Sequence, residues 1–274
     1  MLKYIFFSLF TQFSIGLIFT ILFVSIKEIG NLFYRVTTGV AFILMVLAMI
    51  SHPFANVNVT DLMNIESNST QVLTYWFFIL SMFFILIYNL MHPRFHKQLL
   101  SVVVTFGIIA VGFYSVAIHQ SLKIKVFENV LFVMNDIAAT LILGSALGAM
   151  ITGHWYLVQH KLSLTPLKHS VSIYLSSVIF RIIMTIFTII FYWKLSIHTT
   201  LIANLASLNF TSYIFIGRIV IGLFIPLLFG VMVWKTAKIR AKQSATGILY
   251  ATIIMVLIGE TFAKFLNYTI GIPL

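Results

Sequence analysis

Val40-Ala41-Phe42-Ile43-Leu44-Met45-Val46-Leu47 is an unbroken apolar run, and it decides how this chain folds. A strand of a membrane β-barrel alternates apolar and polar residues with a period of two, and this run does not alternate. Lipid offers no hydrogen-bond partner to the backbone N–H and C=O groups, so such a run crosses a bilayer as an α-helix. The run therefore predicts a transmembrane helix.

Similar charge-poor stretches recur along the whole chain, and each is long enough to cross about 30 Å of hydrocarbon. They lie near residues 4–26, 36–57, 71–91, 98–118, 129–153, 171–193, 212–234 and 246–268. The connections between them are short, and no repeat or linker divides the chain. We predict an all-α integral membrane protein, a bundle of eight transmembrane helices, in which residues 1–274 form a single polytopic transmembrane domain.

The composition excludes an ordinary soluble domain. The chain is 61% hydrophobic and 8% charged, whereas soluble domains are about 45–50% apolar and about 25% charged. It contains no cysteine, which removes disulfides, thiolate zinc sites, iron–sulfur ligation and c-type haem attachment. We therefore expect no bound metal or haem in this chain, and we interpret its net charge of +11 as an orientation signal and not as nucleic-acid binding.

The basic residues of the loops predict the orientation of the bundle. Cytoplasmic loops of membrane proteins are enriched in Lys and Arg. The loops after the first, third, fifth and seventh helices carry most of them, while the opposite side carries Lys3, Lys123, Lys125 and Lys194. Both termini are therefore expected to be extracytoplasmic, in a multi-pass protein of the cell inner (cytoplasmic) membrane. The richer side holds Lys27, Arg35, Arg94, Lys97, Lys161, Lys168, Lys235, Lys238, Arg240 and Lys242.

Charged residues also lie inside the predicted helices: Asp136, Arg181, Arg218, Glu260 and Lys264. A charge at membrane depth costs a few kcal/mol and is by default functional or paired. Asp136, Arg218 and Glu260 are predicted to lie roughly 10 Å below the outer surface, with Lys264 one turn closer to it, whereas Arg181 lies near the middle of its helix. Glu260 and Lys264 can pair along one helix turn, and Asp136 can pair with Arg218 across helices.

Two interpretations of these charges stay open. In the first, they are structural ion pairs that tie the fifth, seventh and eighth helices together. In the second, they line an outward-opening polar pocket for an amphipathic ligand such as a quinol. Oxidation of a quinol releases two protons and so requires a base near the surface. His52, at the outer end of the second helix, is predicted to reach the same pocket, and imidazole titrates near neutral pH.

Three stretches resemble the membrane-anchor subunit of the dimethyl sulfoxide reductase family, within the polysulfide-reductase type of eight-helix quinol-binding anchors. Gly217-Arg218-Ile219-Val220-Ile221-Gly222-Leu223 is similar to the start of that family's seventh helix. The stretch 257–268, which contains Gly259-Glu260 and Lys264, is similar to its last helix. Phe7-Ser8-Leu9-Phe10-Thr11-Gln12-Phe13-Ser14-Ile15-Gly16 is similar to its first helix. His52 and Pro53 match a His and a Pro of the family's quinol-site segment, at a different spacing.

The resemblance implies an anchor subunit of a respiratory oxidoreductase that takes part in anaerobic respiration. Such a subunit holds an iron–sulfur subunit and a molybdopterin catalytic subunit, and it exchanges electrons with quinone, most often menaquinone, as an exchangeable substrate. The expected quinone-binding residues are His52, Asp136, Arg218, Glu260 and Lys264. His52 or Glu260 would take the quinol proton, and Arg218 would hold a quinone oxygen or orient a carboxylate.

Two other classes of membrane protein stay open from the sequence. A secondary transporter would use the buried charges as a gate, and Pro226 in the seventh helix is an interior helix break of the kind found in transporters. A b-type cytochrome would hold haem between two histidines at one depth, for which His52 and His119 are the candidates.

Overall fold

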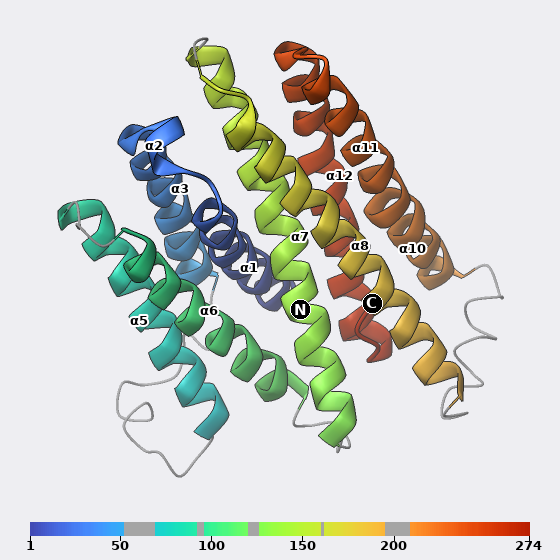
Figure 1. The fold of residues 1–274 in the computed structure, drawn as a ribbon. Helices are drawn as coiled ribbons and strands as arrows, with labels where there is room; N and C mark the ends of the chain where they lie inside the picture. Colours follow the sequence, from blue (N-terminus) through green and yellow to red (C-terminus); the bar gives the residue numbers. More distant parts are fainter. Residues whose placement is uncertain (52–68, 92–95, 120–125, 160–161, 195–208) are drawn as a thin grey trace.

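The computed structural model describes residues 1–51, 69–91, 96–119, 126–159, 162–194 and 209–274. In these residues the chain is helical without β-strands, and eight of the helices are long and apolar enough to cross a membrane. The predicted fold class, an all-α bundle of eight membrane-spanning helices, is confirmed. Figure 1 shows the helices as an antiparallel array.

The helices, in chain order, are α1 (Leu2–Leu22), α2 (Ile26–Ile29), α3 (Asn31–Ile50), α5 (Ser69–Met91), α6 (His96–His119), α7 (Val126–Val158), α8 (Thr165–Lys194), α10 (Phe210–Ile219), the π-helical turn η2 (Val220–Phe224), α11 (Ile225–Lys238) and α12 (Lys242–Ile270). The seventh span consists of α10, η2 and α11 in direct succession.

The sequence placed the first two boundaries too late. The first span was expected at 4–26 but ends at Leu22, and the second was expected at 36–57 but begins at Asn31. The short helix α2 and Gly30, whose φ is 92°, turn the chain earlier than the polar residues alone suggest. Residues 52–57 lie outside the described part of the chain.

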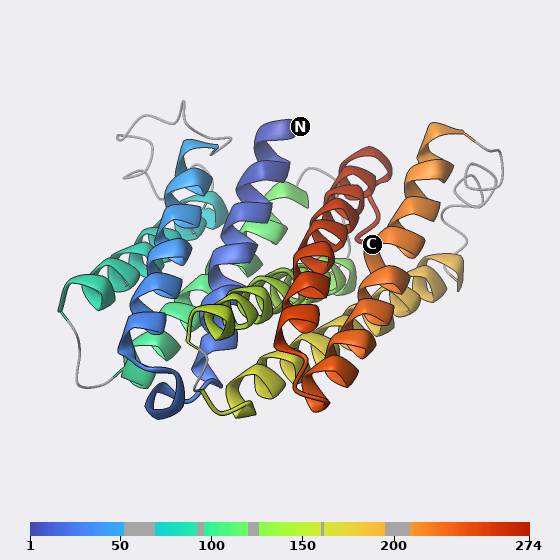
Figure 2. The same ribbon diagram turned by 90° about the horizontal axis from the view of Figure 1, so that it is seen from above.

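The central helices of the bundle are α1 and α7. In the most apolar stretch of α1 and of α7, 78% and 67% of the residues are buried, whereas in that of α5 only 22% are. Figures 1 and 2 show α3, α5 and α6 on one side of this central pair and α8, α10, α11 and α12 on the other. Because the chain crosses the bundle eight times, Leu2 and Ile270 lie at the same end. We call it the terminal end, and the opposite end, with the α7–α8 and α11–α12 connections, the loop end.

Glycine contacts let the helices approach closely at two crossings. A Cβ atom added to Gly16 of α1 would lie 2.9 Å from the Cα of Gly144 in α7. A Cβ atom added to Gly259 of α12 would lie 2.1 Å from the Cα of Gly222 in η2. Lipid tails are as apolar as Leu side chains, so helices in a bilayer associate through close packing of small residues and through polar contacts. Both crossings bring polar side chains together, as described next.

Candidate functional site

Glu260 is at the centre of a buried ionic network in the terminal half of the bundle. Its side chain is 0% exposed, and both carboxylate oxygens contact arginine. Arg181 donates from Nε to Oε1 and from Nη2 to Oε2, each at 2.9 Å. Arg218 approaches Oε1 with its Nη1 at 3.0 Å. One carboxylate from α12 therefore joins a guanidinium of α8 to a guanidinium of α10.

The other donors of Arg181 extend the network to α7 and to the end of the chain. Its Nη1 donates to Oδ1 of Asn135 at 2.8 Å, and its Nη2 donates to the backbone carbonyl of Leu274 at 2.7 Å. The Asn135 amide donates in turn to Oγ1 of Thr188 at 2.9 Å. No partner was predicted for Arg181, because its position near the middle of a helix separated it from the other charges. The structure places it in the network.

A second ion pair lies beside the first. The ammonium of Lys264 contacts Oδ1 of Asp136, and the amide Nε2 of Gln12 donates to the same oxygen at 3.1 Å. Asp136 follows Asn135 in sequence, and Lys264 lies one helix turn after Glu260. The Glu260 network, which reaches Asn135 of α7, and the Asp136–Lys264 pair thus share two helices, α7 and α12, and belong to one layer of the bundle.

The charged side chains predicted to meet therefore do meet, but they do not form the predicted ion pairs. Glu260 pairs with Arg181 and Arg218 instead of with Lys264 along its own helix, and Asp136 pairs with Lys264 instead of with Arg218. Each carboxylate finds its cation on another helix, because the close crossings bring neighbouring helices within reach. His52 lies outside the described residues.

The glycine crossings explain this geometry. Gly259 precedes Glu260 and packs against Gly222, which lies one turn after Arg218. Gly16 lies one turn after Gln12 and packs against α7 at Thr140 and Gly144, close to Asp136. Each ionic or polar contact is thus next to a backbone contact that a larger residue would prevent.

The π-helical turn lies next to Arg218. η2 begins at Val220 and is followed by Pro226, which lacks the N–H of a regular helix and whose carbonyl accepts a hydrogen bond from Tyr174 at 2.8 Å. Single π-turns are often found at functional sites, where they change the direction of nearby side chains. The break expected from Pro226 is therefore a local widening of a continuous helix.

Among the side chains of the network, cations outnumber carboxylates. Arg181, Arg218 and Lys264 face two carboxylates, those of Asp136 and Glu260. Arg218 is 0% exposed, and its contact with Glu260 lacks hydrogen-bond alignment, so none of its three nitrogens has a hydrogen-bond acceptor among the described residues. Buried guanidinium donors without acceptors are costly. This arrangement favours a further oxygen atom beside Arg218.

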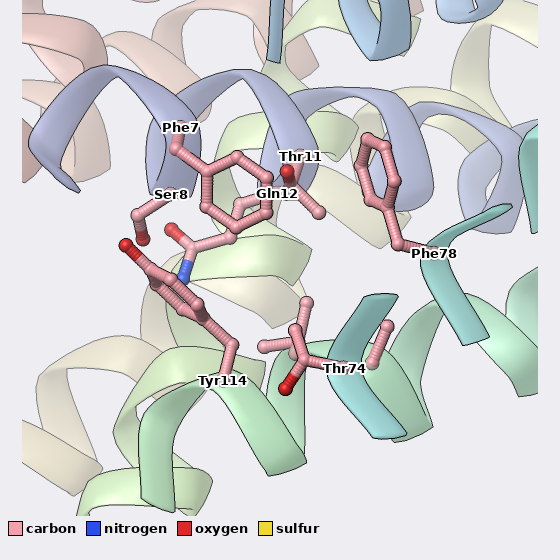
Figure 3. Close-up of a pocket in the computed structure, with 9 residues that line it drawn as sticks. Phe7, Ser8, Thr11, Gln12, Thr74, Phe78 and Tyr114 are labelled. Atoms are coloured by element: carbon pink, nitrogen blue, oxygen red, sulfur yellow. The ribbon is translucent and has the colours of Figure 1, made fainter. Parts of the chain in front are cut away.

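A small cavity adjoins the network on the side of α1, α5 and α6. Figure 3 shows Phe7, Phe78 and Tyr114 around it, with the Gln12 amide at its edge. Its volume is about 10 Å³, room for about one water molecule. Oε1 of Gln12 and Oγ1 of Thr11 are buried there without a partner among the described residues. The cavity suits water and is too small for a ring-shaped ligand.

Comparison with protein-family models, curated proteins and solved structures found no match to this chain. The structure itself defines the class, a multi-pass membrane protein whose helices meet around a buried, cation-rich network. Within the described residues, no group of three or more His, Asp or Glu side chains is arranged to hold a metal ion.

Proposed function

We propose that this chain is the membrane-anchor subunit of a multi-subunit respiratory oxidoreductase of the dimethyl sulfoxide reductase type. It binds quinol or quinone, with menaquinone the favoured type, and exchanges electrons with an iron–sulfur partner subunit that serves a molybdopterin catalytic subunit. One observation carries the proposal. The three stretches that resemble the family lie far apart in sequence, yet their polar residues Gln12, Arg218, Glu260 and Lys264 meet in one network.

The chemistry of quinol oxidation gives each residue a role. A quinol that becomes a quinone loses two electrons and two protons, so it needs a proton acceptor and donors that stabilise a negatively charged oxygen. Arg218 has guanidinium donors without acceptors, and we assign it the quinone oxygen. Both oxygens of Glu260 contact arginine. Glu260 therefore positions Arg218, and Asp136, with Lys264 as partner, takes one of the two protons, while the other passes to His52 or to water.

Access to Arg218 is proposed from the α10 side. Tyr213 and Ile216 of α10 are 60% and 50% exposed, which in a bilayer means contact with lipid, where a quinol with an isoprenoid tail dissolves. His52 remains a second candidate for proton transfer.

The electrons of the quinol leave through the iron–sulfur partner subunit. This chain has no cysteine to hold an iron–sulfur cluster, so a thiolate-bound cluster belongs to another subunit. The loop charges support a location in the inner (cytoplasmic) membrane with the terminal end, and hence the network, toward the extracytoplasmic side.

The test is quinol oxidation by the tagged chain in native membranes and after purification with its partners. We expect copurification of an iron–sulfur and a molybdopterin subunit. Arg218→Ala is expected to lower menaquinol oxidation by about 100-fold or more, Arg218→Lys less, and the exposed Lys235→Gln not at all. A dye that donates electrons directly to the partner subunits checks that the complex is intact.

Unchanged quinol turnover in Arg218→Ala and Asp136→Asn would overturn the assignment of the site. Purification without redox subunits, together with ion-driven uptake by vesicles that contain the chain, would overturn the class and support a secondary transporter. An absorbance spectrum with haem bands would support a b-type cytochrome instead.

A further inference from the structure

The loop end of the bundle carries two hollows that share two basic residues. One hollow, of about 700 Å³, is lined by Lys168, His169, Trp234, Arg240 and Lys242, among others. The other, of about 740 Å³, is lined by Arg240, Lys242 and their neighbours and reaches Tyr156. Figures 1 and 2 show the start of α8 near the α11–α12 turn at this end. We call the two hollows together the basic hollow.

The described residues that line the basic hollow include cations and no acid. Among the described residues, the acid in contact with its rim is Glu28, which accepts a hydrogen bond from the Ser163 hydroxyl at 2.6 Å. Basic pockets between membrane helices are suited to anionic lipid headgroups. The hollow therefore attracts a negatively charged group.

Two helix N-termini add to this attraction. α8 begins at Thr165 and α12 begins at Lys242, and both residues line the hollow. Neither helix has an acidic residue in its first turn, and α12 has no side-chain cap. The positive end of the helix dipole favours an anion at such positions.

The Lys242 side chain is also held in place. Arg240 has a φ of 61°, the left-handed conformation that a non-glycine residue adopts at a cost, and its carbonyl accepts from the N–H of Lys242 at 2.9 Å. The Lys242 ammonium lies 5.2 Å from the centroid of the Tyr156 ring. The tight turn and the cation–π contact fix Lys242 at the point where the two hollows meet.

We propose that the basic hollow binds the phosphate group of an anionic phospholipid. The neighbouring surface favours a lipid over free phosphate, because Leu162, Leu164 and Trp234 line the hollow and Ile239, next to Arg240, is 76% exposed. Acyl chains pack against these apolar side chains while the headgroup contacts Arg240 and Lys242. Trp234 lines the hollow at the boundary, where aromatic residues of membrane proteins concentrate. The site is remote from the ionic network and independent of the proposed function.

The test is native mass spectrometry of the purified full chain with phosphatidylglycerol and with phosphatidylcholine of the same acyl chains. We expect phosphatidylglycerol to bind at least about tenfold more tightly, and the double variant Arg240→Gln/Lys242→Gln to lose that preference. The control Lys97→Gln/Lys235→Gln removes the same charge at the same end, outside the hollow, and is expected to keep it. A second variant, Lys168→Gln/His169→Gln, changes α8 and leaves the strained turn intact, and it is expected to weaken binding as well.

Three results would overturn the proposal. If the control variant lost the preference for phosphatidylglycerol to the same extent, the preference would come from net charge alone. Equal binding of the two lipids would remove the phosphate preference. Displacement of phosphatidylglycerol by millimolar inorganic phosphate would make the hollow a site for free phosphate and not for lipid.

Discussion

Helices α1, α3, α5 and α6 pack around an apolar, aromatic core, whereas α7, α8, α10 and α12 meet around buried ions. In the first group, Phe77 stacks on Phe113 and Phe84 stacks on Phe106, each with ring centroids 5.7 Å apart. In the second group, three ion pairs join four helices. Lipid tails can replace an apolar contact between helices, but they cannot replace the partner of a buried ion. The second group therefore depends on single residues far more than the first.

The largest effect is expected from Glu260→Gln. The change removes the negative charge that Arg181 and Arg218 share and leaves two buried guanidinium groups without a counter-ion. Loss of one partner of a buried ion pair costs about 3–5 kcal/mol. We expect the free energy of unfolding in mixed micelles to fall by that amount. Glu128→Gln, at the half-buried first turn of α7, is the control, and an equal loss there would show that Glu260 has no special role.

The pair of Asp136 and Lys264 is expected to have the next largest effect. Asp136→Asn and Lys264→Met each leave one buried charge and are expected to cost about 3 kcal/mol. The double variant leaves neither charge, so it is expected to lose less than the sum of the two by about 1–3 kcal/mol. Unfolding of all four proteins in mixed micelles measures this coupling, and strict additivity would contradict the direct contact.

The sequence predicted the fold class and that Asp136, Arg218, Glu260 and Lys264 meet, but neither that Arg181 joins them nor how the charges pair. Apolar runs fix the number of spans, and the distance of Asp136, Arg218, Glu260 and Lys264 from their helix ends gives them a shared depth. The partner of each charge depends on how each helix is rotated about its axis and how closely it approaches its neighbours. Those properties are set by contacts such as Gly222 with Gly259, which join residues far apart in sequence. Because these contacts are not visible in the sequence, the position of Arg181 along its helix could be predicted but its partner could not.

The glycine contact itself gives the third prediction. In Gly259→Ala the new methyl group would lie 2.1 Å from the Cα of Gly222, so α12 and η2 must separate. Overpacking of this kind costs about 1–3 kcal/mol. Gly247→Ala on the same helix meets open space, and it is expected to stabilise the protein by up to about 1 kcal/mol because Ala is the better helix former. Thermal unfolding of both variants is the measurement, and equal shifts would show that the close crossing is unimportant.

The smallest effect is expected in the aromatic half. Phe77→Leu removes ring contacts with Phe113 and Phe106 but leaves an apolar side chain of similar reach. An aromatic pair contributes about 0.5–1.5 kcal/mol beyond the buried area, so we expect a loss of about 1 kcal/mol in mixed micelles. Phe187→Leu on α8, where the ring is 47% exposed, is the control and is expected to change stability by less than about 0.5 kcal/mol. The result would be contradicted if Phe77→Leu lowered the free energy of unfolding as much as Glu260→Gln does. Ring stacking would then stabilise the first group of helices as strongly as ion pairs stabilise the second, and the two groups would not differ.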